Sequence, residues 1–571
     1  MDILSNTTSV LPAGVQSALN TTLPLASAKA QLQEYLTHLP ISPLTTVLVT
    51  FSVATLLFVA ARAFGNDPKT PPQLPDAVPF ISNAWQFMTN MTKFEVRAAA
   101  AFEKSRVFTF WLGLKKVYMV TGPKNIQVLF RSTANIDNYA LQEQVMPTMW
   151  RMPKNELALW TRDRTGRGKV PLPGRGIEIP ENERHWYQNH HIWHEYLIHK
   201  DYANYLALDF YKFFSAHLEE KFPLGEWNNV GLLNFFKYDM AQSAITAVFG
   251  TKIFELNPGF MDTFWAFEEV MATIITAPLP KILNPKPYQR QEVMCQMMQK
   301  WLDHAWANFE WDNPEKAESH WDELFGARLS RESAKWMKNF CAETQTGFFS
   351  GLVFGQNANT IPMSLWSMIE IVRDPILLAA VRAEILSVYT TDPSTGAKSI
   401  DTKKVVALPL LQSVYVETMR VHMSIALMRA VVKPMELGGY QLQQDSLIQT
   451  PMRYAHMDPV HWDHPEHPAH EFWGWRHVKT VDGELTFVAP KPGTWFPYGG
   501  GASGCPGRYF AKQEILMALA MMVGRFDIEF VEWTHYDGTK SDREAQNDER
   551  YAGAAAMPPD RDLKIRVKRL W

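Results

Sequence analysis

The sequence is poor in cysteine, with three residues in 571, at positions 295, 341 and 505. So small and odd a set argues against a disulfide framework and favours a reducing compartment. The sequence also lacks an excess of either charge. Its formal net charge is −3, which argues against nucleic acid as a partner. No internal repeat is found along the chain.

One long apolar run lies near the N-terminus. Residues 44–61 carry no charge and number 18, which is at the short end of what spans a bilayer. Arg62 follows, and positive charge beside a span marks its cytoplasmic side. We therefore predict a luminal leader at 1–43, a transmembrane anchor helix, and a catalytic domain on the cytoplasmic side of the endoplasmic reticulum membrane. Glycosylation sequons at Asn6 and Asn20 agree with a luminal leader. A buried core helix is the alternative.

A proline-rich segment at 62–79 follows the predicted anchor and is typical of a stiff linker. We expect residues 80–571 to form one large domain that is mainly α-helical with small β-sheets. Helical periodicity is clear over residues 205–222, 234–249, 290–309 and 346–372. Short strand patterns occur at residues 107–112, 117–120, 437–442 and 563–567.

Cys505 lies in a glycine-rich stretch, residues 495–511, directly before a helix-forming run. Glycines let the backbone approach a flat macrocycle without Cβ clashes, and N–H groups at a helix N-terminus stabilise a thiolate. A thiolate ligand to haem iron favours O–O cleavage. The stretch lacks the Gly-Lys-Ser/Thr ending of a phosphate-binding loop. The sequence therefore predicts that Cys505 is the axial ligand of a haem iron.

The same stretch resembles the haem-binding signature of the cytochromes P-450. The positions that carry the resemblance are Tyr498, Gly501, Cys505, Gly507 and Arg508. Tyr498 stands where the family usually has phenylalanine. Ser503 stands where many members carry an arginine or histidine that contacts the haem, so one propionate contact is in doubt. The resemblance implies a cytochrome P-450 fold and a haem b cofactor held by these residues.

Three further motifs occur along the chain in the same order as in the cytochromes P-450. Glu417 and Arg420 look like its Glu-x-x-Arg helix motif, and residues three apart share one face of a helix. Arg476 is similar to the arginine that completes this ion-paired triad, which implies structural support of the cysteine loop. Arg429 matches the position where the family commonly binds a propionate.

Two features near residue 170 each allow two interpretations. Residues 151–185 are polar and rich in proline and glycine, and we expect a solvated surface loop, with an anionic partner as the alternative. His190, His191 and His194 lie near Trp186, in a region where the family often places a propionate contact. Histidines in such positions are more often structural, and that role is favoured here.

The oxygen-activation segment is the main departure from the family pattern. Ala358 and Asn359 occupy positions where an acid and a threonine are common, and Thr360 comes one residue later. This form resembles the sterol 7α-hydroxylase branch with its fungal members, and a related asparagine occurs in prostacyclin synthases. We predict that Asn359 and Thr360 organise proton delivery through water, since an amide donates and accepts hydrogen bonds without ionising. Alternatively, Asn359 and Pro362 only accommodate a helix kink.

Together these patterns predict a membrane-anchored haem-thiolate monooxygenase. The resemblance implies electrons from NADPH through a flavoprotein reductase, and one oxygen atom of O₂ inserted into a bulky apolar substrate such as a sterol, terpenoid or alkaloid. The alternative is a haem-thiolate isomerase or dehydratase that needs no reductase, and Asn359 is its support. A haem-binding sensor or carrier is a third hypothesis, against which the oxygen-side motifs argue.

Overall fold

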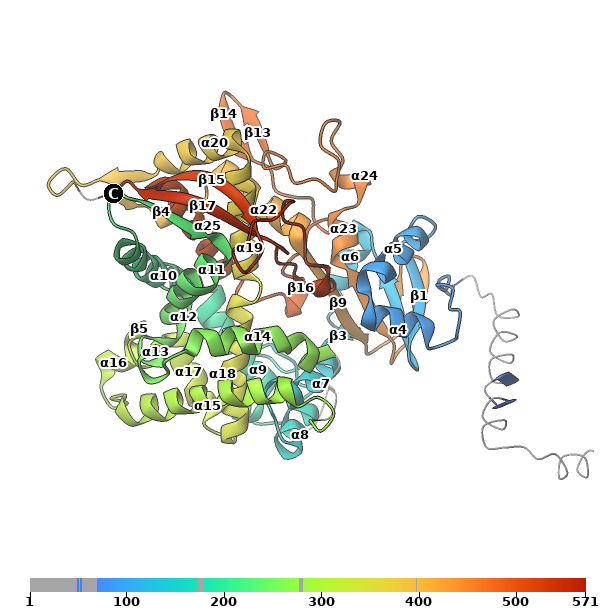
Figure 1. The fold of residues 1–571 in the computed structure, drawn as a ribbon. Helices are drawn as coiled ribbons and strands as arrows, with labels where there is room; N and C mark the ends of the chain where they lie inside the picture. The colour runs from blue at the N-terminus through green and yellow to red at the C-terminus, as the bar shows by residue number, and fades with distance from the viewer. Residues whose placement is uncertain (1–48, 51, 54–68, 173–177, 277–280, 397) are drawn as a thin grey trace, which may run out of the picture. The chain divides into compact units, whose positions relative to one another are not determined.

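The structure, a computed structural model, describes residues 49–50, 52–53, 69–172, 178–276, 281–396 and 398–571 (Figure 1). The chain divides into two compact units, residues 1–68 and residues 69–571. The predicted leader lies outside the described residues, as does most of the predicted anchor. Among the residues that are described, no helix combines the length and the apolar character needed to cross a bilayer.

The second unit is mainly helical with small sheets, as the sequence predicts. Its longest described helices are α10 (Lys200–Lys221), α14 (Phe260–Thr276), α15 (Pro285–Asn308), α18 (Ala342–Asn357) and α25 (Arg508–Arg525). Shorter helices that matter for the site are α6 (Pro123–Arg131), α7 (Tyr139–Met149), α8 (Lys154–Arg162), α9 (His185–Trp193), α19 (Thr360–Arg373), α20 (Pro375–Leu386) and α22 (Pro409–His422).

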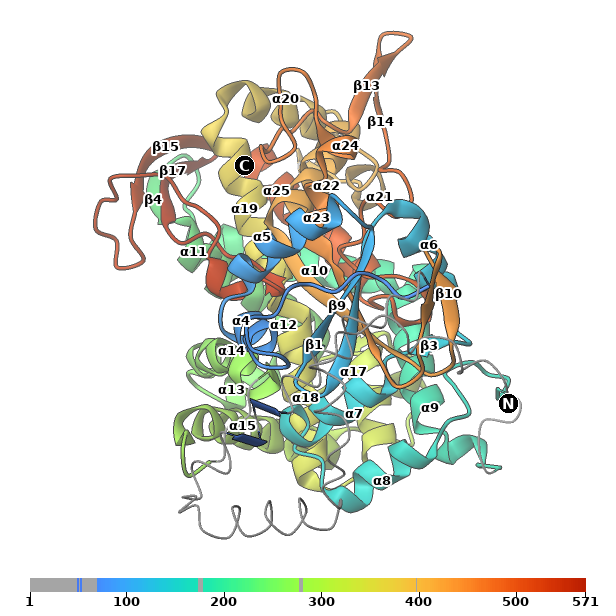
Figure 2. The same cartoon turned by 90° about the vertical axis from the view of Figure 1, so that its right-hand side faces the viewer.

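The largest sheet lies at one side of the helical body, beside α4 (Ser82–Thr89) and α5 (Met91–Phe102), as Figures 1 and 2 show. Five of its strands follow the order β1 (Val107–Leu112), β2 (Lys115–Val120), β12 (Leu447–Pro451), β9 (Met423–Val431) and β16 (Ala554–Ala556), and β3 (Ile136–Asp137) also pairs with β9. A smaller sheet at the other side contains β15 (Phe526–Thr534), β17 (Asp562–Arg569) and β4 (Trp227–Gly231).

Part of the predicted proline-rich linker belongs to the second unit. The N–H of Leu74 donates to Thr109 O over 2.7 Å, and the N–H of Thr109 donates to Pro72 O over 2.8 Å. Leu74 is buried against the neighbouring core. Residues 72–74 therefore pair with β1 as part of the second unit.

Helix α25 lies at the centre of the described fold. It contacts α10, α19, α20 and α22, and its residues 514–525 are all buried. A helix that is buried on every side has no solvent face to reveal a period. The segment that follows Cys505 is thus anchored in the buried core.

Three sequence expectations need correction. The strand pattern at 437–442 is a hairpin of β10 (Met435–Leu437) and β11 (Tyr440–Leu442), because Gly438 and Gly439 adopt positive φ and turn the chain. The stretch 151–185 contains α8 and buried polar side chains, so it is not a solvated loop throughout. The helix expected over 346–372 is divided into α18 and α19.

Candidate functional site

Cys505 ends a tight loop that runs directly into α25. Its N–H donates to the carbonyl oxygen of Tyr498 over 2.9 Å. The side chain is accessible, yet enough protein surrounds it for burial to raise the pKa of the thiol. The N–H groups of Gly507 and Arg508, together with the charge of Arg508, lower that pKa in part. These donors would stabilise a thiolate bound to a metal.

The glycines of this loop allow it to pack against α6. Gly501 has a φ of +67°, and a Cβ built on it would lie 2.3 Å from the carbonyl oxygen of Phe130. A Cβ on Gly500 would lie 2.3 Å from the Phe130 ring. At Gly507 the nearest atom to such a Cβ is the sulfur of Cys505, at 3.9 Å. The sequence suggested that the glycines serve only the approach of a cofactor. In the structure, Gly500 and Gly501 also permit the loop to contact α6.

Tyr498 links the Cys505 loop to α22. Its hydroxyl lies 2.6 Å from the hydroxyl of Tyr415, and either oxygen can donate. Burial, and the nearby Tyr415 and Cys505, raise the pKa of Tyr498 far above its usual value, so it stays protonated. The phenol that replaces the family's phenylalanine thus has a hydrogen-bond partner of its own.

Glu417, Arg420 and Arg476 form one buried ion-paired group. Arg420 donates to both carboxylate oxygens of Glu417, over 2.7 and 2.8 Å, and Arg476 donates to Oε1 over 2.8 Å. Glu417 and Arg420 are completely buried. Burial alone would raise the pKa of Glu417, but the contacts of Arg420 and His477 and the charge of Arg476 hold it well below its usual range.

This group is connected to the Cys505 loop through His456, which sequence reasoning missed. Arg420 donates to the carbonyl oxygen of His456 over 2.9 Å. The ring Nε2 of His456 accepts from the N–H of Phe496, in the Cys505 loop, over 3.0 Å. Burial and the charge of Arg420 lower the pKa of His456 to about 3, so the ring is neutral and able to accept. His456 belongs to no recognisable sequence motif, so no signal in the sequence pointed to this role.

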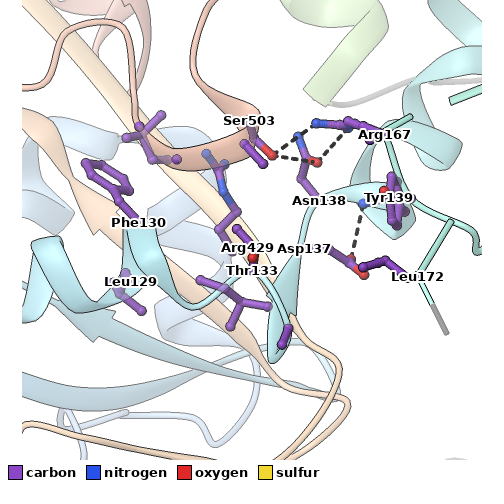
Figure 3. Close-up of a pocket in the computed structure, with 18 of the residues that line it drawn as sticks. Leu129, Phe130, Thr133, Asp137, Asn138, Tyr139, Arg167, Leu172, Arg429 and Ser503 are labelled. Carbon is purple, nitrogen blue, oxygen red and sulfur yellow. Dashed lines mark hydrogen bonds between the residues drawn. The ribbon is translucent and has the colours of Figure 1, made fainter. Parts of the chain in front are cut away.

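A cavity of about 270 Å³ lies beside the loop (Figure 3). Residues 500–503 form part of its lining, together with Arg429 of β9 and Phe130 of α6. Arg429 donates to Met428 O over 2.8 Å, and its guanidinium makes no ion pair within the described residues. Burial and the charge of Arg167 lower the pKa of Arg429 to about 10.

The donor set fits a haem. An accessible cysteine with N–H donors near its sulfur provides a thiolate ligand, and the cationic cavity a few residues away provides a place for carboxylates. Cys505 itself does not line this cavity, while Gly501 and Arg429 do. The structure therefore brings the predicted ligand loop and the predicted propionate arginine to the same region.

The oxygen-activation segment is broken at Ala358 and Asn359, between α18 and α19. Pro362 has no N–H to donate to the carbonyl of Ala358, which explains the interruption. The Oδ1 of Asn359 accepts from the N–H of Ala556 in β16 over 2.9 Å. Thr360 is buried, and its carbonyl accepts from Ser364 Oγ over 2.9 Å. The helix is thus interrupted at this segment, and the side chain of Asn359 accepts a hydrogen bond from β16.

Within a carboxamide only the oxygen accepts hydrogen bonds, so the bond from Ala556 fixes the orientation of the Asn359 side chain. Its NH₂ group is then the end available to other partners, and it can only donate. Helix α19, which begins at Thr360, contacts α25 directly. The helix that begins at this segment therefore packs against the helix that follows the candidate iron ligand.

The site has the ligands that a haem-thiolate protein needs, and the comparisons with known proteins give the same class. A family model described as Cytochrome P-450 matches residues 178–540. The chain is 43% identical over 519 residues to cytochrome P-450 monooxygenase calL of Penicillium decumbens, covering 90% of this chain and 96% of that one.

More distant relatives match as well. Identity is 24% over 552 residues to cytochrome P-450 monooxygenase fsoE of Humicola fuscoatra, covering 89% of each chain. It is 26% over 226 residues to cholesterol 7-alpha-monooxygenase of Cricetulus griseus, covering 38% of this chain and 44% of that one.

The chain belongs to the cytochrome P-450 family. It is an oxidoreductase, a cytochrome P-450 monooxygenase, and the predicted similarity to the sterol 7α-hydroxylase branch is confirmed.

Proposed function

We propose that the protein inserts one oxygen atom from O₂ into a bulky apolar substrate, with electrons from NADPH that arrive through a flavoprotein reductase. The haem would supply the activation of O₂. Cys505 would hold its iron, and Arg429 would bind a propionate. The observation that carries this proposal is the combination of N–H donors near the Cys505 sulfur with a cationic cavity beside the same loop.

The roles of the supporting residues follow from their contacts. Glu417, Arg420 and Arg476 would brace the ligand loop, because Arg420 reaches it through His456. Asn359 would position a water or a substrate oxygen with its NH₂ group, since its Oδ1 is occupied by Ala556.

The substrate class is proposed from the relatives. One of them acts on cholesterol by its name, and two others are fungal monooxygenases. We therefore propose a polycyclic or prenylated substrate, such as a sterol, a terpenoid or an alkaloid, within a secondary-metabolite pathway.

The proposal includes anchoring in the endoplasmic reticulum membrane through residues 44–61, with glycosylation at Asn6 or Asn20 in a luminal leader. Protease treatment of sealed microsomes tests the orientation, because a cytoplasmic catalytic domain is digested while the leader is protected. A glycosidase-sensitive mass shift that disappears in Asn6→Gln or Asn20→Gln tests the leader. Full protection of the catalytic domain contradicts the orientation.

Reconstitution with a reductase tests the reaction. We expect NADPH-dependent consumption of O₂ and a product heavier by one oxygen atom from a panel of sterols, terpenoids and alkaloids. Cys505→Ser, which keeps the size of the side chain and removes the thiolate, is the matched control and should give no product. A product that retains label from ¹⁸O₂ supports monooxygenation.

The second candidate is an isomerase or dehydratase that acts on an oxidised substrate such as a peroxide. The observation that favours it is Asn359, which can donate but cannot ionise, at the usual threonine position. Turnover of a lipid peroxide without NADPH or reductase, combined with no product under monooxygenase conditions, selects this candidate.

A further inference from the structure

Two arginines from different parts of the chain face the cavity beside the Cys505 loop. Arg429 comes from β9, and Arg167 comes from the loop that follows α8. Figure 3 shows Arg167 on the side of Ser503 and Asn138, with Arg429 nearby. Each arginine has its pKa lowered by burial, and the charge of Arg167 lowers that of Arg429 further. Asp137 lines the same cavity, so the two arginines leave a net positive charge there, which favours an anionic occupant.

The partners of Arg167 within the described residues are neutral. Its guanidinium donates to Ser503 Oγ over 3.1 Å, to Asn138 Oδ1 over 2.9 Å and to Gln142 Oε1. It lies 5.1 Å from the ring centroid of Tyr139 and 5.5 Å from that of Trp186. Among the described residues Arg167 makes no ion pair. The nearby Asp137 and Tyr139 act on its pKa electrostatically, but burial outweighs them.

The backbone around Arg167 is held firmly. Arg184, which is 2% exposed, donates to Thr165 Oγ1, Gly168 O and Lys169 O over 2.8, 2.6 and 2.8 Å. This rigid backbone holds the Arg167 side chain in position before any ligand binds, which lowers the entropy cost of binding.

The positions that usually provide a cation here do not do so in this chain. Ser503 is neutral, and its hydroxyl donates to Asn138 and accepts from Arg167. Burial, with a contribution from Arg167, lowers the pKa of His190 to about 4, so this imidazole is uncharged near neutral pH. Arg167 is therefore the cation that stands next to Ser503.

We propose that Arg167 binds one haem propionate, in place of the cation missing at position 503. Arg429 binds the other propionate. The proposal rests on the proposed haem assignment. A guanidinium matches a carboxylate through two parallel hydrogen bonds. The loop that carries Arg167 is thus part of the cofactor site.

The test compares haem release from the purified holoenzyme of matched variants, with an excess of apo-globin as the haem acceptor. Arg167→Gln should release haem about 10- to 100-fold faster, as expected for the loss of charge-assisted hydrogen bonds. It should also lower the reduction potential, because a positive charge near the haem favours the reduced iron. Arg167→Lys, which keeps the charge, should stay within a few-fold of the parent.

Arg164→Gln is the matched control. Arg164 lies three residues away in the same loop, but its charge is paired with Glu143 and it does not line the cavity. Its haem release should equal that of the parent. Adding Ser503→Arg to Arg167→Gln should restore slow release, since it returns a cation to the usual position.

Parental haem release and potential in Arg167→Gln overturn the inference. Equal acceleration in Arg164→Gln also overturns it, because the effect then reflects general damage to the loop. If Arg167→Gln does not fold, the decision falls to Arg167→Lys, for which haem release about tenfold or more faster than that of the parent counts against the inference. A parent chain that binds no haem contradicts the proposed function instead, so the two failures are distinguishable.

Discussion

Replacement of Gly501 by alanine tests how the ligand loop is positioned. The new Cβ would lie 2.3 Å from Phe130 O, and ordinary contacts begin at 3.4 Å, so either the loop or the end of α6 must move by about 1 Å. The positive φ adds a strain of about 1–2 kcal/mol for a residue with a side chain. The obstacle is a backbone carbonyl, which cannot rotate away as a flexible side chain would.

A displacement of this size should affect haem binding strongly. A misplacement of about 1 Å near reacting groups costs about a hundredfold in rate, and here it moves the loop that carries Cys505. We expect Gly501→Ala to show a lower haem-to-protein ratio and a weaker red-shifted carbonyl absorbance after reduction. Urea unfolding of the same samples measures the accompanying loss of stability.

Gly504→Ala provides the control within the same loop. Gly504 has a φ of −63°, and its added Cβ would meet nothing closer than Gly501 O at 3.4 Å. This variant should keep the haem content and the absorbance of the parent. Normal haem loading in Gly501→Ala, or equal damage in both variants, would refute the packing argument.

Further predictions concern the ligand, the buried ion pairs and the helix break. Cys505→Ala should abolish the red-shifted carbonyl absorbance, and a variant that keeps the band refutes the ligand assignment. Arg420→Ala should destabilise the protein by about 3–5 kcal/mol in urea unfolding, because it removes both hydrogen bonds that Arg420 donates to the buried Glu417 carboxylate and leaves that charge only partly paired; a loss below about 1 kcal/mol contradicts the bracing role. Since the pKa of Glu417 is held below its unfolded value, its stabilisation should be complete above about pH 4.3 and should be lost as the pH falls below that value. Comparison with Glu417→Gln, which cannot titrate, checks this, and identical pH profiles speak against it. Asn359→Ala should release more hydrogen peroxide per product formed. An unchanged ratio of peroxide to product would exclude a role in proton delivery and leave Asn359 only its structural contact with β16.

Local spacing in the sequence predicted those site features that depend on one element. Glu417 and Arg420 are three residues apart on a helix, so their shared face follows from helix geometry. The break after α18 was also foreseeable as an alternative, because Pro362 removes a backbone donor. In both cases neighbours along the chain determine the outcome.

Contacts between segments that are distant in the sequence could not be predicted from local spacing. The bond from Arg167 to Ser503 joins residues 336 positions apart, and the carbonyl of Phe130 meets Gly501 only after α6 and the loop have packed. His456 supports the ligand loop through an N–H that no motif marks. Because these contacts depend on how elements approach each other, the composition of 151–185 suggested solvent where the structure has a cavity wall.

The contact between Asn359 and β16 has a consequence for how the protein is made. Ala556 follows Asn359 by 197 residues, so at about 5–20 residues per second a ribosome needs about 10–40 s to supply it. During that time α19 exists on the nascent chain without its partner strand. The oxygen-activation segment therefore reaches its final form only after the residues of the ligand loop have been added.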